Sequence, residues 1–358
     1  MAMNKASLTQ DVPPDRVEAM EKIIERPKPV KVMILGGVDT GKTTLTVYLA
    51  NALVEQGLKV AIIDSDVGQK GILPPATISL ALAEAPFSSL GELSPLKHYF
   101  VGTVTPNQHF AEMVVGVTRL ARLAQEVADV VLIDTTGLVH GPGVELKRMK
   151  IEAVGPDIVL ALDREGELAP ILKPFEGKLD VVKLQVSDKA RSYSRGERRD
   201  MRREKWRAYF RGVRPITLDL SKFVITGTSL FQGRPLSEEE KGLLEGIFKW
   251  LILHGRKVGG RYFIVKADVG EGPRSVDRNV LRYIDFDRLS NILLGLIDED
   301  GFCLGLGILK LLNFGDMKAE ILTPLDDGEL ARVKEIRFGR MRVREDGEEL
   351  GLLDRDAL

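Results

Sequence analysis

Nine residues near the start of the chain have the types and the spacing of a phosphate-binding loop. They are Gly36, Gly37, Val38, Asp39, Thr40, Gly41, Lys42, Thr43 and Thr44, and they fit the P-loop pattern G-x-x-x-x-G-K-[ST]. The glycines let the backbone curl so that its N–H groups point at one anion. The lysine of such a loop reaches the β- and γ-phosphates, and the next hydroxyl is a ligand of Mg²⁺. We therefore expect residues 36–44 to bind a nucleotide, with Lys42 catalytic and Thr43 on the metal.

Two apolar segments further along each run into aspartate. Val60–Ile63 is followed by Asp64 and Asp66, and Val130–Ile133 is followed by Asp134. An apolar strand that ends in Asp, in a chain with a P-loop, is typical of the carboxylate that reaches the Mg²⁺ shell. Aspartates at such positions also form turns or cap helices. All three remain candidates for the metal site.

A strongly basic segment follows the last of these apolar runs. Between residues 189 and 214 eleven cationic residues face three acidic ones. The cations are Lys189, Arg191, Arg195, Arg198, Arg199, Arg202, Arg203, Lys205, Arg207, Arg211 and Arg214. Such a run is often only a solvated charged helix. In a chain of net charge −1, the local excess favours a nearby anion, such as a phosphate of a nucleotide or a nucleic acid.

The elements that must position these residues alternate between strand and helix. Short apolar runs predict buried strands, and helical periodicity between them predicts the connecting helices. The predicted strands are Val32–Leu35, Val60–Ile63, Val130–Ile133, Ile158–Leu162 and Val181–Val186, and the helices are Thr43–Glu55, Phe110–Ala128 and about Val144–Ala153. This order predicts an α/β fold, a P-loop NTPase with a doubly wound parallel sheet whose ligands lie at the C-terminal strand ends.

The remaining parts of the chain differ in pattern from this core. We expect an N-terminal extension at 1–29 containing one short helix over Val17–Ile24, a P-loop domain at 30–220 and a β-rich domain at 221–358. In the last, a helix begins at Ser237 and runs to about His254, and a linker lies near Ser221–Gly233. The predicted strands there are Tyr262–Ala267, Val280–Asp285, Ile292–Ile297, Phe302–Leu312, Ala319–Leu322 and Val333–Val343.

The composition limits the class of protein and the compartment in which it can work. The chain has 358 residues, 44% of them hydrophobic and 29% charged, with a single cysteine, Cys303. These values describe a globular protein whose two domains have ample core. One cysteine excludes an intramolecular disulfide and fits a reducing compartment. No stretch has the length and apolarity of a membrane span, so we expect a cytoplasmic or nucleoplasmic protein with no membrane partner.

The P-loop by itself does not separate a GTPase, an ATPase and a kinase. A GTPase would normally carry N-K-x-D, which is absent, and a partitioning ATPase would carry a second lysine early in its P-loop, where residues 36–39 have none. A kinase needs a mobile cationic lid over the transferred phosphoryl. The segment Arg195–Arg203, after the last core strand, stands where such a lid belongs.

Taken together, the motifs resemble the polynucleotide 5′-hydroxyl kinase family, which includes the kinase subunit of the pre-mRNA cleavage factor, ribosomal-RNA-processing kinases and compact archaeal members. The resemblance covers about Val30–Asp219. It rests on the P-loop, residues 64–69 (DSDVGQ), Thr105-Pro106 with His109, residues 134–137 (DTTG), residues 162–165 (LDRE) and the pair Arg198 and Arg202. By spacing alone, residues 102–109 are a loop that leads into a helix, with Thr105 as N-cap and Pro106 in the first turn.

This resemblance implies transfer of the γ-phosphoryl group of ATP to the 5′-hydroxyl of RNA, with DNA a further acceptor, and dependence on Mg²⁺ or another divalent metal ion. The implied catalytic residues are Lys42, Asp66, Arg198 and Arg202; the implied substrate residues are Gln69, Thr105, Pro106 and His109; the metal candidates are Thr43, Asp66 and Asp134. Residues 162–165 are expected near the nucleotide base. Leu138 stands where eukaryotic members have a Trp that stacks on the substrate base, and a leucine cannot stack in that way.

Two alternatives remain open at this point. A small-molecule kinase on the same core would need a closed acceptor pocket and no extended basic surface. An ATP-binding switch or scaffold of an RNA-processing complex would bind ATP and RNA but transfer nothing. ATP turnover that a polynucleotide stimulates would support the polynucleotide kinase, whereas ATP hydrolysis without an acceptor would support the switch.

Overall fold

The computed structural model describes residues 12–267 and 276–354, which fall into two compact units, residues 1–205 and residues 206–358. The division falls inside helix α6 (Arg195–Tyr209). The sequence analysis placed the domain limits at 29/30 and 220/221. Whether those segments fold independently is not decided by the division into two compact units, so these limits stay a prediction. No helix among the described residues is both long and apolar enough to cross a membrane.

The first unit is built on a sheet with the strand order β4-β3-β2-β5-β1-β6-β7. Its five parallel strands are those expected from the sequence, and all but β7 are almost completely buried, as strands covered on both faces must be. They are β1 (Val30–Gly36), β2 (Val60–Ser65), β5 (Val130–Thr135), β6 (Ile158–Leu162) and β7 (Asp180–Leu184). Two antiparallel strands, β3 (Thr77–Ala83) and β4 (Pro95–Phe100), extend the sheet beyond β2 and were not expected.

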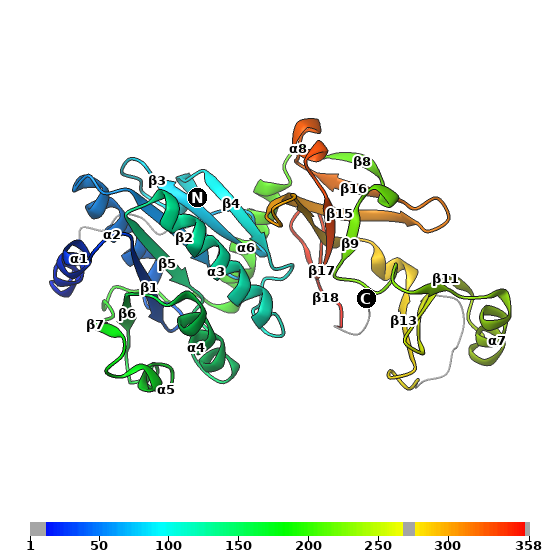
Figure 1. Ribbon diagram of the computed structural model, residues 1–358, viewed down its shortest axis with the longest axis horizontal. Helices are drawn as coiled ribbons and strands as arrows, with labels where there is room; N and C mark the ends of the chain where they lie inside the picture. Colours follow the sequence, from blue (N-terminus) through cyan, green and yellow to red (C-terminus); the bar gives the residue numbers. More distant parts are fainter. Residues whose placement is uncertain (1–11, 268–275, 355–358) are drawn as a thin grey trace. The chain divides into compact units, whose positions relative to one another are not determined.

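Helices cover both faces of this sheet (Figure 1), so the doubly wound α/β arrangement is confirmed. On one face, α1 (Asp15–Glu25) and α2 (Lys42–Glu55) pack on side chains such as Val32 and Ile34. On the other lie α3 (Phe110–Val127) and α4 (Pro142–Val154). Gly116 allows α3 to approach β4, because a Cβ there would lie 2.5 Å from Tyr99. The short helices of this unit are η1 (Leu90–Glu92), α5 (Ala169–Leu172) and η2 (Lys173–Phe175).

The second unit contains the β-rich part of the chain, in two sheets. The larger has the order β18-β17-β14-β15-β16-β8, with β9 beside β17. Its strands are β8 (Arg214–Asp219), β9 (Val224–Thr226), β14 (Ile292–Ile297), β15 (Cys303–Asn313), β16 (Lys318–Thr323), β17 (Glu335–Val343) and β18 (Glu349–Leu352). The segment expected as a linker, Ser221–Gly233, therefore contributes a strand. The short helices η3 (Leu220–Lys222), η4 (Phe286–Leu289) and α8 (Asp327–Ala331) lie between these strands in the sequence.

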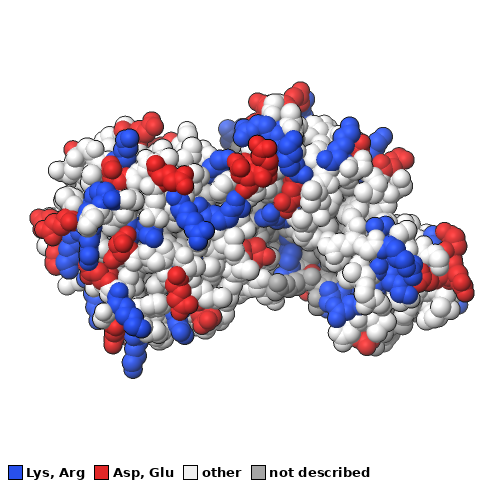
Figure 2. Space-filling model, viewed as in Figure 1, with Lys and Arg blue, Asp and Glu red and all other residues white. Residues whose placement is uncertain are grey.

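The smaller sheet is formed by β10 (Arg234–Pro235), β11 (Ile252–Val258), β12 (Arg261–Lys266) and β13 (Leu281–Asp285). Helix α7 (Glu238–Phe248) packs on it and begins with the expected Ser237 cap. The helix expected to reach His254 instead ends at Phe248, because Lys249 has a left-handed backbone with φ +56° and β11 starts three residues later. Figure 2 shows acidic side chains gathered over α7.

Candidate active site

The P-loop joins β1 to α2, as the sequence predicts. Gly41 has φ +86° at the N-cap of α2, a backbone conformation that glycine adopts without strain. Lys42, only 7% exposed, donates from Nζ to the carbonyl oxygen of Gly37 at 2.6 Å. Burial lowers the pKa of Lys42, while the carboxylates of Asp134 and Asp66 act in the opposite direction. The ammonium group therefore lies inside the loop, within reach of an anion bound by the loop amides.

Thr43 and Asp134 meet beside this loop. The Thr43 hydroxyl donates to Asp134 Oδ2 at 2.6 Å, and the other carboxylate oxygen, Oδ1, is buried without a hydrogen-bond partner in the described part of the chain. Burial, with repulsion from Asp64, raises the pKa of Asp134 to about 7.

A buried carboxylate oxygen that accepts no hydrogen bond, next to a hydroxyl group, forms a pair of oxygen ligands that suits Mg²⁺. This ion is usually held by one or two carboxylates plus phosphate oxygens and waters, and not by an all-protein cage. Accordingly, no group of three or more His, Cys, Asp or Glu side chains placed to hold a metal occurs among the described residues. Thr43 and Asp134 thus fit an Mg²⁺ ion that arrives with a nucleotide.

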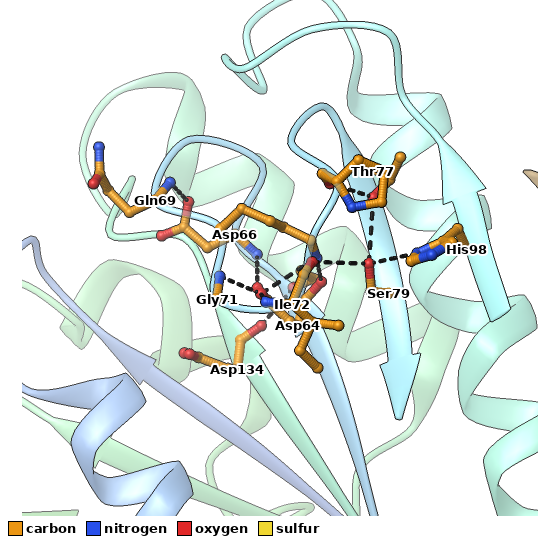
Figure 3. A network of polar contacts seen from close by, with 12 residues as sticks. Asp64, Asp66, Gln69, Gly71, Ile72, Thr77, Ser79, His98 and Asp134 are labelled. Carbon is orange, nitrogen blue, oxygen red and sulfur yellow. Dashed lines mark hydrogen bonds and ion pairs between the residues drawn. The ribbon is translucent and has the colours of Figure 1, made fainter. Parts of the chain in front are cut away.

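The two aspartates at the carboxyl end of β2, Asp64 within it and Asp66 just after it, have different surroundings (Figure 3). Asp64 accepts hydrogen bonds from the amides of Asp66, Gly71 and Ile72, and Lys70 Nζ lies 3.3 Å from its Oδ2. Its lone pairs are therefore occupied in shaping residues 64–72. This leaves Asp66 and Asp134 as the carboxylates available for chemistry.

Asp66 is held by one oxygen only. Its Oδ1 accepts from the backbone amides of Gly68 and Gln69, both at 2.9 Å, whereas its Oδ2 makes no hydrogen bond within the described ranges. The carboxylate is therefore oriented by the backbone with one oxygen left to accept a proton or a metal. The Gln69 side chain points away from Asp66 (Figure 3), so the two side chains present separate polar groups.

The predicted substrate residues Thr105, Pro106 and His109 lie between β4 and α3. Helix α3 begins at Phe110, as its periodicity predicts, but the N-cap expected at Thr105 is wrong, because the N-cap position belongs to His109. Gln108, with φ +66°, interrupts the helical path before that point. Thr105 and Pro106 are partly exposed, while the His109 ring is 6% exposed and lies 3.8 Å, measured from Nδ1, from Glu112.

The basic segment forms helix α6, whose first turn is capped by Ser194 and Glu197. The Ser194 amide donates to Glu197 Oε2 at 2.8 Å and the Glu197 amide donates to Ser194 Oγ at 3.2 Å, a reciprocal capping box. Arg198 lies just after the cap and forms an ion pair with the P-loop residue Asp39. Arg202 is one turn further on the same helix and is partly exposed. The arrangement brings the predicted lid to the P-loop.

A cavity of about 470 Å³ opens beyond the carboxyl ends of β6 and β7. Its lining residues are Asp163, Arg164, Gln185, Val186, Ser187, Asp188 and Ala190. It borders the P-loop, because Arg164 Nη2 donates to the carbonyl oxygen of Asp39 at 2.8 Å. Residues 162–165, expected near a nucleotide base, thus supply part of this cavity.

Three buried lysines beneath the site were missed by the sequence analysis. Lys70, Lys147 and Lys150 are each at most 1% exposed. Lys147 donates to the carbonyl oxygen of Thr136, and Lys150 donates to the Ser65 hydroxyl at 3.0 Å. Lys147 and Lys150 thereby tie α4 to the loop after β5 and to the end of β2. The available signal was the placement of Lys147 and Lys150 among Leu146, Ile151 and Val154 on the apolar side of a helix.

Lys150 gives the protein a pH-dependent stability. Burial lowers the pKa of Lys150 to about 7, the Lys70 ammonium adding to the effect and Asp66 opposing it. Between this value and the pKa near 10.5 of an unfolded lysine, the unfolded state binds more protons, so stability rises with pH. We expect the free energy of unfolding of the wild type, minus that of Lys150→Met, to rise by about 1.4 kcal/mol per pH unit between pH 7.5 and 9.

Urea unfolding at several pH values measures this difference. Lys178→Met, at an exposed lysine, is the matched control and should leave the difference flat. A difference for Lys150→Met that does not change with pH would show that Lys150 stays charged in the folded protein.

Comparisons with known proteins agree with this site. The family model described as mRNA cleavage and polyadenylation factor CLP1 P-loop matches residues 36–212. A protein of Pyrococcus abyssi named polyribonucleotide 5′-hydroxyl-kinase is 63% identical over 359 residues, covering 100% of both chains. A protein of the same name from Methanocaldococcus jannaschii is 52% identical over 356 residues, covering 99% of both.

The fold also occurs in a solved structure. The Clp1p chain in a complex of wild-type Clp1p with Pcf11p matches with a TM-score of 0.60 at 16% identity, covering 91% of this chain and 77% of that one. The resemblance inferred from the P-loop, the Asp64–Gln69 run and the lid arginines is thereby confirmed. The chain belongs to the CLP1 P-loop family and is related along its whole length to the archaeal proteins named polyribonucleotide 5′-hydroxyl-kinase.

Proposed function

We propose that this protein is a polyribonucleotide 5′-hydroxyl kinase, which transfers the γ-phosphoryl group of ATP to the 5′-hydroxyl end of RNA. One observation carries the proposal: Lys42, Thr43, Asp134 and Asp66 come together at the carboxyl ends of β1, β2 and β5 in a chain related over its full length to proteins of that name. The reaction forms a bond from the RNA 5′ oxygen to the γ-phosphorus and breaks the bond to the bridging oxygen of ADP.

In this proposal the P-loop binds the ATP phosphates and the adjacent cavity accepts the base. Lys42 turns from the Gly37 carbonyl to the phosphates, exchanging one hydrogen bond for a charge-assisted one. Thr43 and Asp134 would hold Mg²⁺, which when bound neutralises charge on the β- and γ-phosphates. The cavity beside Arg164, of about 470 Å³, has the size of a small-ligand pocket and borders the P-loop.

Asp66 orients the 5′-hydroxyl and accepts its proton through the oxygen that the backbone leaves free. Arg198 and Arg202 place positive charge over the transferred phosphoryl, whose loose transition state asks mainly for positioning and electrostatic stabilisation. Gln69, Thr105, Pro106 and His109 belong to the RNA-binding side of the site. The single cysteine, Cys303, which is buried, is consistent with a cytoplasmic location.

A radiolabel transfer assay tests the proposal. The protein is incubated with Mg²⁺, γ-labelled ATP and a 5′-hydroxyl RNA oligonucleotide, beside the same RNA carrying a 5′-phosphate. We expect label on the 5′-hydroxyl strand only, and its loss with EDTA. A DNA oligonucleotide of the same sequence determines whether the acceptor extends to DNA.

The controls separate the proposed kinase from a nucleotide-dependent switch. If the protein binds ATP and RNA but labels no strand across a range of metals and temperatures, phosphoryl transfer to RNA is excluded, and a switch or scaffold becomes the better description. Label on a small hydroxyl compound but not on RNA would point to a small-molecule kinase.

A further inference from the structure

The third variable residue of the P-loop, Asp39, connects three separate segments. Its Oδ2 accepts hydrogen bonds from the Tyr193 amide at 3.0 Å and from Arg198 Nη2 at 2.5 Å, both in or next to the lid helix. Its backbone carbonyl oxygen accepts from Arg164, beside the cavity after β6. The lid, the cavity wall and the phosphate loop therefore meet at one residue.

The contact between Arg198 and Asp39 is more shielded from water than the ion pair between Arg191 and Glu197 in the same segment. The side chains of Arg198 and Asp39 are 23% and 14% exposed, whereas those of Arg191 and Glu197 are 56% and 42% exposed. Exposed ion pairs contribute little, while charge-assisted hydrogen bonds shielded from water are stronger. Asp39 is thus the anchor that holds the first turn of α6 on the P-loop.

We propose that Asp39 is a positioning residue, which docks the lid on the P-loop and orients Arg198 toward the phosphates. The guanidinium has five N–H donors in a rigid fork. One Nη2 donor goes to Asp39, so the Nε and Nη1 donors stay available to phosphate oxygens. The orientation toward the transferred phosphoryl rests on the proposed function; the docking of the lid does not.

The backbone geometry at Asp39 allows a substitution that removes the charge and keeps the local conformation. Its backbone lies in the left-handed region at φ +58°, which asparagine tolerates better than other non-glycine residues. Asp39→Asn keeps an oxygen that can accept from the Tyr193 amide but removes the charge that pairs with Arg198. Asp200→Asn makes the same change in charge at an exposed position of the same helix and is the matched control.

The first experiment measures docking of the lid without the kinase reaction. The protein is digested briefly with trypsin in the absence of ligand, and cuts within residues 189–205 are followed by mass spectrometry. We expect Asp39→Asn and Arg198→Ala to be cut in the lid about 5-fold faster than the wild type, and Asp200→Asn to be cut at the wild-type rate, because open segments are cleaved in proportion to their population. Equal rates for Asp39→Asn and the wild type would overturn the docking role.

The second experiment asks whether Asp39 acts through Arg198. We expect Asp39→Asn to lower kcat/KM about 10-fold in the wild-type background and to have no further effect in Arg198→Ala, as coupled neighbours do. An undiminished loss in the Arg198→Ala background would mean that Asp39 acts by shaping the P-loop and would overturn the positioning role. Wild-type protein with no kinase activity would remove the proposed function, but the trypsin result would still stand.

Discussion

Asp66→Asn is expected to lower the rate of phosphoryl transfer to RNA by about 10³-fold, within the range found for loss of a positioned general base. The substitution keeps the oxygen that accepts from the amides of Gly68 and Gln69, so residues 64–69 retain their shape. It replaces the oxygen that is free to take the proton of the 5′-hydroxyl by an NH₂ group, which cannot accept one. The loss should therefore fall on kcat while ATP binding changes little.

Single-turnover transfer of label under saturating ATP, with ATP binding measured separately by calorimetry, checks this expectation. Asp64→Asn is an informative comparison, because Asp64 accepts from the amides of Gly71 and Ile72 and should affect stability more than chemistry. Transfer by Asp66→Asn within tenfold of the wild type would exclude Asp66 as the proton acceptor, and the search would move to Asp134.

Lys42→Met is expected to lower kcat/KM by about 10³-fold and to weaken ATP binding, because it removes a preorganised positive charge from the phosphate site. Methionine retains most of the apolar stem of the lysine in a position that is 7% exposed. Burial already disfavours the charged form of Lys42, and within the described residues its ammonium group donates only to the Gly37 carbonyl oxygen. Removal of this charge should therefore cost little stability, and the loss should be specific to function.

Steady-state kinetics, together with the thermal unfolding midpoint of the same preparation, tests this expectation. The midpoint of Lys42→Met should lie within a few degrees of the wild-type value. Lys42→Arg keeps the charge but brings a planar, wider group into the loop, and we expect it to be similarly inactive. If Lys42→Met binds ATP and phosphorylates RNA normally, the nucleotide does not sit in the P-loop as proposed.

The sequence predicted the core of the first unit almost element by element, because its signals are local. The five apolar runs became parallel strands, and the P-loop became a turn between β1 and α2. Strands β3 (Thr77–Ala83) and β4 (Pro95–Phe100) were missed because they pair antiparallel and no α-helix lies between β2 and β4, so the alternation of strand and helix does not mark them. The end of α7 was misplaced because the residue that adopts the left-handed backbone there is Lys249. A glycine at that position would have indicated the end of the helix in the sequence.

In the candidate site, too, some features follow from local sequence and others from tertiary structure. Residue type and spacing alone determined the phosphate loop, the carboxylates at the ends of β2 and β5, and the cationic lid, since each is written in a few adjacent residues. Tertiary structure alone decided which carboxylate is free. Asp64 and Asp134 are paired in register, yet only Asp64 is saturated by amides seven and eight residues away.

Tertiary structure also decided the roles of residues whose partners are distant in sequence. Asp39 meets Arg198 across 159 residues, and Lys150 meets Ser65 across 85. For Lys150, burial lowers the pKa, and charged neighbours brought close by the fold act on it as well. Thus the sequence by itself determined the chemistry that this protein can bring to a phosphate, and the packing of the sheet, α4 and α6 decided which of its charged groups are free to use it.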